Sequence, residues 1–262
     1  MIAFKDVHKS FGPKHVLQGF TLDVRDGETM VIIGYSGTGK SVAIKHVVGL
    51  LDPDAGHCEV DGEVVHEMDR HRLMALRSRI GFVFQFAALF DSMTIHDNVA
   101  FGLRRRRDLS DSEISDRVAH ALELVDLPGT GERMPAELSG GMRKRVGLAR
   151  AIAIEPRYML YDEPTTGLDP VTSAVIDELM VRTREALGVT SIVITHDMKS
   201  AFRVGDRIAM LYQGRVRFTG TADDVRATDD PILRNFVEGN PQPDENVLSS
   251  RDELHRVEPV AG

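Results

Sequence analysis

One stretch decides the fold of this chain: Gly34-Tyr35-Ser36-Gly37-Thr38-Gly39-Lys40-Ser41. A wholly apolar run at 30–33 precedes it, as expected of a strand buried on both faces, and a helical pattern follows it to Leu51. Glycines at this spacing let the backbone curl so that its N–H groups point at phosphate oxygens, and the helix adds its positive end. We therefore expect a phosphate-binding loop in which Lys40 reaches the outer phosphates and Ser41 holds Mg2+. The alternative is a chance glycine-rich turn.

On the amino side of this loop the pattern predicts antiparallel strands. Apolar residues alternate at 2–7 and at 16–24, and the pair Asp61-Gly62 indicates a hairpin over 60–65. The first ninety or so residues therefore combine antiparallel strands with one buried strand-loop-helix unit.

On the carboxyl side, short apolar runs at 158–161 and 191–195 predict further strands of a buried sheet. A helix is expected between them, from Pro170 to a glycine stop at Gly188. The fold class is therefore α/β.

The middle third of the sequence has helical character. Capping signals at Thr94 and Ser110 open helical patterns, so we interpret residues 86–155 as a helical insertion in the sheet domain. We expect that domain to span residues 1–238 and an extension to span 239–262. The extension has too few apolar residues for a core of its own, and its small apolar anchors favour packing on a second copy over disorder.

Charge and composition exclude several classes of function. A net charge of −8 disfavours nucleic acid as the main partner, because phosphate-rich polymers select basic proteins. The single cysteine, Cys58, and a polar start fit a reducing cytoplasm, and Cys58 is expected to be a small buried residue. No apolar run approaches the roughly 18 residues of a membrane helix, so a role at a membrane would require a partner.

Two carboxylates follow the apolar run at 158–161. Asp162 and Glu163 would lie at the carboxyl end of a buried strand, where α/β sheets bind their ligands. Asp162 can steady the magnesium shell, and Glu163 can orient or deprotonate an attacking water. Alone, the pair fits a solvated loop equally well; beside an independent phosphate loop, it indicates a nucleotide hydrolase.

Two other polar residues also follow predicted strands. Gln85 follows the run at 80–84 and could touch the metal or the water, whereas its alternative is a surface amide. His196 follows the run at 191–195 and could contact the terminal phosphate, whereas its alternative is a structural histidine.

A second helix start has the features of an anion site. Ser139 is placed as an N-cap before a helical pattern that reaches Ile154, and Gly140 and Gly141 expose backbone donors. The basic residues further along this helix, Arg143 to Arg145 and Arg150, predict a solvated face near the nucleotide and not a nucleic-acid surface. Two copies arranged head to tail could close both cradles around two ATP molecules.

The ordered set of these features resembles the ABC-transporter ATPase family: the phosphate loop, Gln85, Leu138-Ser139-Gly140-Gly141, Tyr161-Asp162-Glu163-Pro164, Gly167-Leu168-Asp169 and His196. The resemblance covers residues 1 to about 220. It implies an ABC ATPase fold with a RecA-like, mainly parallel sheet core, an antiparallel β subdomain and an inserted helical subdomain. It also implies ATP and Mg2+ as cofactors, and a homodimer beneath an integral membrane permease.

The same resemblance assigns roles to single residues. Glu163 falls where the general base acts, and Asp169 falls where a loop couples the two sites. Phe11 falls where an aromatic ring stacks on adenine, although it fits an ordinary edge-strand aromatic as well. Val42 departs from the family, because many members place a phosphate-binding hydroxyl at this position.

Two stretches resemble, more narrowly, the ATPases of Mla-type, MCE-associated phospholipid transporters: residues 85–101 and 139–146. Met142 stands where ABC importers usually have glutamine. This resemblance implies transport of phospholipid between the membranes of a Gram-negative envelope, with an MCE lipid-binding protein and often a STAS-domain subunit as further partners. The chain would then work as a peripheral subunit on the cytoplasmic face of the inner membrane.

Two other functions stay open. One is the ATPase of a small-solute importer, for example of amino acids. The other is a soluble ABC-type regulatory ATPase without a channel, although such proteins commonly have two cassettes or a long inserted coiled coil, which this sequence lacks. The arginine run at 104–107 is interpreted as a solvated helix end, with docking to the permease or to anionic headgroups as the alternative.

Overall fold

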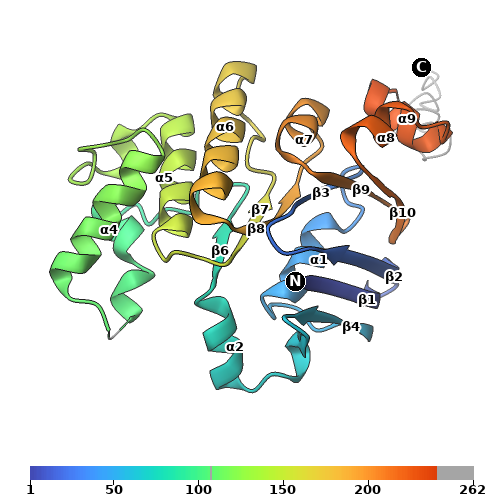
Figure 1. Cartoon of the computed structure of the whole chain (residues 1–262), viewed down its shortest axis with the longest axis horizontal. Coiled ribbons are helices and arrows are strands. Elements are labelled where there is room, and N and C mark those ends of the chain that lie inside the picture. The colour runs from blue at the N-terminus through green and yellow to red at the C-terminus, as the bar shows by residue number, and fades with distance from the viewer. Residues whose placement is uncertain (107, 241–262) are drawn as a thin grey trace, which may run out of the picture.

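A computed structural model describes residues 1–106 and 108–240 of the chain. A mainly parallel sheet runs through its centre in the strand order β10-β9-β3-β8-β7-β6 (Figure 1). Neighbouring strands in it are parallel, except that β10 runs antiparallel to β9. Its strands are β3 (Thr29–Ile33), β6 (Ile80–Val83), β7 (Tyr158–Asp162), β8 (Thr190–Ile194), β9 (Arg207–Tyr212) and β10 (Arg215–Gly220).

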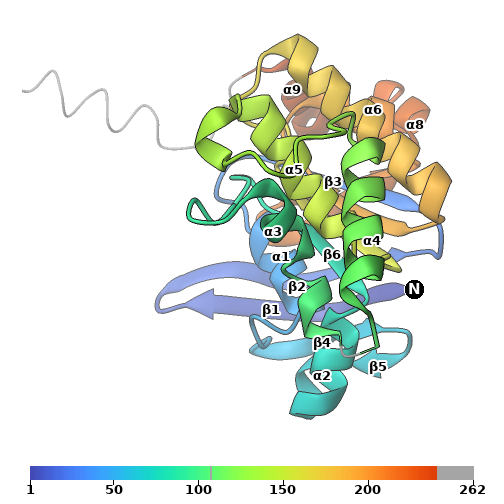
Figure 2. The same ribbon diagram turned by 90° about the vertical axis from the view of Figure 1, so that its left-hand side faces the viewer.

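An antiparallel sheet forms a second layer, in the order β2-β1-β4-β5. Figure 2 shows this layer on the opposite side of the molecule from helices α6 (Pro170–Leu187) and α9 (Pro231–Glu238). The predicted hairpin over 60–65 is confirmed as the pairing of β4 and β5. The strands of this sheet are β1 (Ile2–Phe11), β2 (Lys14–Val24), β4 (Ala55–Val60) and β5 (Glu63–Val64).

The inner strands of the central sheet, such as β3, β7 and β8, are buried on both faces because successive residues enter two different cores. In β3, Val31 and Ile33 pack in a core with the helices that follow β6 and β7. Met30 and Ile32 pack instead with the antiparallel sheet and the helix after β3. This alternation explains why the predicted apolar runs show no polar face.

The helix after the phosphate loop is α1 (Lys40–Val47), which ends before the predicted Leu51. Its end is set by Gly49, whose φ of 60° lies in the left-handed region that stops a helix. Between β6 and β7 the structure is helical, and the predicted caps at Thr94 and Ser110 are confirmed. The helices of this insertion are α3 (Ile95–Ala100), α4 (Asp111–Leu124) and α5 (Gly140–Ile152), with short turns at Leu103–Arg105 and Pro135–Glu137.

After β7 the predicted helix to Gly188 is confirmed as α6, and Gly188 ends it with a φ of 63°. The extension beyond Asn240, with its expected packing on a second copy, lies outside the described residues. The remaining helices are α2 (Arg70–Arg77), α6 (Pro170–Leu187), α7 (Met198–Val204), α8 (Ala222–Arg226) and α9 (Pro231–Glu238), with a short turn at Val65–Glu67.

Cys58 lies on β4 and is buried, as predicted. Among the described helices, none combines the length and the apolar character needed to cross a membrane.

Candidate nucleotide-binding site

The predicted site residues gather at one edge of the central sheet. Because β3, β8, β7 and β6 are parallel neighbours, their carboxyl ends lie side by side. The phosphate loop leaves β3, His196 follows β8, Glu163 follows β7 and Gln85 follows β6. Ligands of parallel α/β sheets bind at this edge.

The phosphate loop needs its glycines for steric reasons. Gly34 has a φ of 149°, and a Cβ atom there would lie 2.4 Å from the Leu211 carbonyl oxygen. Gly39 has a φ of 103°, and a Cβ atom there would lie 2.6 Å from Val16. The loop is therefore pressed against β9 at its start and against β2 at its end, which fixes the start of α1.

The Lys40 side chain lies over this loop and is almost fully buried. Its ammonium donates to the carbonyl oxygens of Gly34, at 2.7 Å, and of Tyr35, at 3.0 Å. Burial lowers the pKa of Lys40, while Glu163 and Asp162 oppose the shift. The Lys40 ammonium lies 4.0 Å from Glu163, so a phosphate entering the loop would meet a cation already held in place.

Ser41 and Asp162, the two residues predicted to bind Mg2+ and its shell, contact each other directly. The Ser41 hydroxyl donates to the Asp162 carboxylate at 2.7 Å. Burial raises the pKa of Asp162, and the hydrogen bond from Ser41 lowers it. Gln85 lines the same pocket as Ser41, whereas Asp162 does not line it and reaches it through the Ser41 hydroxyl. The three side chains carry oxygen donors of the kind that Mg2+ prefers.

Glu163 is at the centre of a small polar cluster. Its carboxylate lies 2.9 Å from His196 Nδ1 and accepts a hydrogen bond of 2.6 Å from the Thr166 hydroxyl. Its backbone has a φ of 50°, a left-handed conformation that non-glycine residues adopt only where their surroundings enforce it. The arrangement presents a carboxylate beside the loop, where it can accept a proton.

One open pocket of about 520 Å³ brings most of the predicted residues together. The half-exposed Phe11 lines it at one end, and Glu163 and His196 line it with the phosphate loop. Lys14, Val16 and Thr166 also line it, although no sequence motif points to them. The predicted members of this lining are Phe11, Ser36, Gly37, Gly39, Lys40, Ser41, Val42, Gln85, Glu163 and His196.

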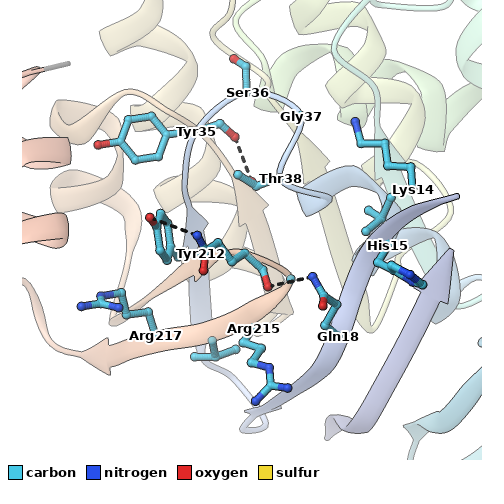
Figure 3. A pocket seen from close by; sticks show the side chains of 14 residues that line it. Lys14, His15, Gln18, Tyr35, Ser36, Gly37, Thr38, Tyr212, Arg215 and Arg217 are labelled. Atoms are coloured by element: carbon cyan, nitrogen blue, oxygen red, sulfur yellow. Dashed lines mark hydrogen bonds between the residues drawn. The ribbon is translucent and has the colours of Figure 1, made fainter. Parts of the chain in front are cut away.

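A second hollow, of about 840 Å³, adjoins the first at Lys14, Val16, Ser36 and Gly37 and reaches the turn between β9 and β10 (Figure 3). The Tyr35 carbonyl accepts a hydrogen bond of 2.8 Å from the Thr38 hydroxyl, which closes the loop on itself. The Tyr35 ring points away from Lys14 in Figure 3 and packs edge-on against Phe236 of α9, with ring centroids 5.0 Å apart. The phosphate loop is therefore supported by the last described helix.

Comparison with known proteins agrees with this geometry. Residues 17–166 match the profile of the ABC transporter family. The chain belongs to this family. Its fold is similar to a dimeric ATP-binding cassette solved in a post-hydrolysis state with ADP and Pi, with a TM-score of 0.77, 33% identity, and coverage of 85% of this chain and 99% of that one. The chain is thus the ATP-binding, ATP-hydrolysing subunit of an ABC transporter.

Relatives of this ABC ATPase are named for the transport of different cargoes. It is 38% identical to the probable ribonucleotide transport ATP-binding protein mkl of Mycobacterium leprae, over 99% of this chain and 75% of that protein. It is 37% identical to the intermembrane phospholipid transport system ATP-binding protein MlaF of Escherichia coli, over 91% and 89% respectively. It is 42% identical to the sulfate/thiosulfate import ATP-binding protein CysA of Caulobacter vibrioides, over 90% and 69%.

The second predicted cradle of this ABC ATPase lies apart from the first. Ser139 caps α5, as predicted, by accepting a hydrogen bond of 3.3 Å from the Met142 amide. Ser139, Gly140 and Gly141 do not line the pocket of the phosphate loop, and Gly140 lines a different hollow with Phe86 and Gly167. One copy of the chain therefore keeps the two predicted half-sites apart.

The prediction that the basic residues of α5 form a solvated face is wrong for three of them. Lys144, Arg145 and Arg150 are half-buried and donate to backbone carbonyl oxygens of other segments. Their long side chains reach across the helix surface to backbone carbonyl groups of neighbouring turns. Only Arg143, among these basic residues, is exposed.

Proposed function

We propose that the pocket residues perform ATP hydrolysis in the following roles. The loop amides and Lys40 bind the phosphates, and Phe11 stacks on adenine. Ser41, Asp162 and Gln85 hold Mg2+, which neutralises phosphate charge when bound. Glu163 orients and deprotonates the attacking water, and His196 contacts the terminal phosphate. The observation that supports these roles is the convergence of Lys40, Glu163 and His196 within hydrogen-bond or ion-pair distance at one sheet edge.

The complete nucleotide site is proposed to form between two copies of the chain. The start of α5 offers amides and the Ser139 hydroxyl to an anion, but it lies outside the pocket of the phosphate loop. A second copy, turned head to tail, would bring its Ser139, Gly140 and Gly141 to the phosphates held by the first. The dimeric state of the similar ATP-binding cassette supports this arrangement.

A Glu163→Gln variant tests both proposals together. It keeps the size of the side chain and removes the base, so hydrolysis should fall by about 10²–10⁴-fold while ATP stays bound. The variant should then accumulate as an ATP-loaded dimer in size-exclusion chromatography. Lys40→Ala is the control, because it should lose ATP binding and stay monomeric. Normal turnover in Glu163→Gln would contradict the role of Glu163.

For the cargo, we propose phospholipid moved between the inner and outer membranes. The similarity to MlaF covers nearly the whole of both proteins, whereas the higher identity to CysA covers 69% of that protein. The proposed partners are an integral membrane permease, an MCE lipid-binding protein and a STAS-domain subunit. The ATPase would then sit peripherally on the cytoplasmic face of the inner membrane.

Purification of the complex from its native membrane, followed by lipid analysis, tests the cargo. Phospholipid and an MCE protein in the complex would support the proposal. A periplasmic solute-binding protein in their place would favour a small-solute importer, the second candidate, which the similarity to CysA supports. Purification without any membrane protein would favour a regulatory ATPase without a channel.

A further inference from the structure

Helix α5, which begins at the second half-site, also holds two segments that leave the central sheet. The Lys144 ammonium donates to the carbonyl oxygens of Pro164, at 2.8 Å, and Thr166, at 2.6 Å. Further along the helix, the Arg150 guanidinium donates to the carbonyl oxygens of Ala87 and Ala88. The two residues bound by Lys144 come just after Glu163 in the sequence, and the two bound by Arg150 come after Gln85.

The segment that Lys144 holds is the turn that presents the Glu163 carboxylate. The Thr166 amide donates to the Glu163 carbonyl at 3.3 Å, and the Thr166 hydroxyl donates to the Glu163 carboxylate. Lys144 therefore binds the carbonyl of Thr166, and the amide and hydroxyl of Thr166 hold Glu163 in place. A displacement of Lys144 would move Thr166, and with it the carboxylate.

The chemistry of this contact suits a fixed link. Burial lowers the pKa of Lys144, and the nearby Glu163 carboxylate opposes the shift. Hydrogen bonds from an ammonium to two carbonyl oxygens are stronger than bonds between neutral groups. The start of α5 is also close-packed, since a Cβ atom on Gly141 would lie 2.6 Å from the Thr172 side chain. These contacts hold α5 against the segment that runs from Glu163 into α6.

We propose that Lys144 is a positioning residue for hydrolysis, which ties the helix start at Ser139 to the Glu163 turn of the same chain. This inference rests on the proposed function, namely the role of Glu163 and the sharing of each pocket by two copies. The nucleotide bound against Ser139 belongs to the partner's loop, whereas Glu163 acts on the nucleotide of its own loop. Lys144 thus connects the occupancy of one site to the geometry of the other.

Lys144→Met tests the link, because methionine keeps the length and removes the donor. We expect kcat to fall by about tenfold to a hundredfold, while the Kd for ATP stays within about twofold of wild type. Lys144→Arg should recover most of the lost rate, since a guanidinium can also donate to two carbonyls. The matched control is Arg145→Met, which loses hydrogen bonds to Val125 and Asp126 at the end of α4 and should keep the wild-type rate.

Mixed dimers of differently tagged copies test the direction of the link. One dimer pairs a wild-type copy with a copy that carries both Glu163→Gln and Lys144→Met. The other pairs a Glu163→Gln copy with a Lys144→Met copy. In the first dimer, Lys144 is present in the copy with the intact Glu163, so ATP should be hydrolysed as fast as in a dimer with one Glu163→Gln copy. In the second dimer, the copy with the intact Glu163 lacks Lys144, so hydrolysis should be slower than that. The reverse order, or equal rates, overturns the proposal.

Amide hydrogen exchange decides the structural part without reference to activity. In nucleotide-free Lys144→Met, exchange over residues 163–168 should be faster than in wild type, and in Arg145→Met it should not. Unchanged exchange over this turn, or a kcat within twofold of wild type, overturns the inference. A wild-type protein that binds no ATP, or forms no dimer with it, would contradict the proposed function instead, and the exchange result would still decide whether Lys144 holds the turn.

Discussion

The Ser41 hydroxyl donates to the Asp162 carboxylate across 2.7 Å, although 121 residues of sequence separate the two. This bond joins the first turn of α1 to the end of β7. It brings together two oxygen donors of the kind that Mg2+ selects.

Ser41→Ala should therefore raise the Mg2+ concentration needed for half-maximal hydrolysis by about tenfold to a hundredfold. Titration of ATPase activity with MgCl2 at saturating ATP measures this shift. Ser41→Cys should respond better to Mn2+ than to Mg2+, because a sulfur ligand suits a softer ion. Ser78→Ala is the control, since its hydroxyl bonds to a carbonyl within α2. An unchanged Mg2+ requirement in Ser41→Ala would sink the metal assignment.

Phe11→Ala should weaken ATP binding by about tenfold, because a stacked aromatic ring is lost at the rim of the pocket. Phe11→Tyr should bind ATP as the wild type does. Tripolyphosphate has no base, so its affinity should be the same in all three proteins. Calorimetric titration of each protein with ATP and with tripolyphosphate measures these affinities. If Phe11→Ala lost as much affinity for tripolyphosphate as for ATP, Phe11 would support the phosphate loop and would not stack on the base.

Asp177 should make stability depend on pH. It lies buried on α6, accepts a hydrogen bond of 3.0 Å from Ser200, and has a pKa raised by burial to about 6. A carboxyl whose pKa is raised on folding stabilises the fold most below its ordinary pKa of 3.8, and this contribution is lost as the pH rises to about 6.

The stability of Asp177→Asn relative to wild type should consequently increase by up to about 3 kcal/mol between pH 4 and pH 7. Urea unfolding of both proteins across this range measures the difference. Asp116→Asn, an exposed carboxylate on α4, controls for the general loss of a charge. A constant difference across the range would mean that Asp177 does not hold its proton in the folded protein.

Cys58 should resist alkylation in the folded protein. It is buried on β4, so a reagent cannot reach its sulfur. Burial also raises the pKa of its thiol, which keeps it out of the reactive thiolate form. Maleimide should label the protein only after unfolding in urea, and mass spectrometry counts the adduct. Rapid labelling of the native protein would show that β4 opens readily.

The arginines at 104–106 should matter little to hydrolysis. Arg104 pairs with Asp97, Arg106 pairs with Asp108, and Arg105 lies 5.2 Å from the centre of the Phe101 ring, whereas position 107 lies outside the described residues. Arg104→Glu should cost about 1 kcal/mol or less and leave the ATPase rate of the isolated protein within twofold. Exchanging the two charges, with Arg104→Asp and Asp97→Arg, should restore the stability. A large loss of rate would instead favour a functional role for this segment.

The sequence predicted the sheet edge of the site because its signals are local. Glycine spacing at 34–39 and apolar runs before Asp162 and His196 each report on a few consecutive residues. Parallel pairing then brings the ends of those runs together without further information.

The support around Glu163 could not be predicted in the same way. Lys144 lies between two arginines on one helix, and nothing in that run distinguishes a side chain that bonds to Pro164 and Thr166 from one that faces solvent. The role of Thr166 is likewise visible only once the turn after Glu163 is known. Such contacts depend on how two distant segments pack, which no local pattern encodes.

The edge-on contact of Tyr35 with Phe236 bears on how much of the chain is needed to bind nucleotide. Helix α9 contributes no side chain to the nucleotide pocket, yet it supplies the aromatic surface on which the phosphate loop leans. Shortening the chain to the end of β10 would keep every residue that lines the pocket and would remove the helix that supports the phosphate loop. We therefore expect the smallest fragment that binds ATP to extend through Glu238, eighteen residues past the end of β10.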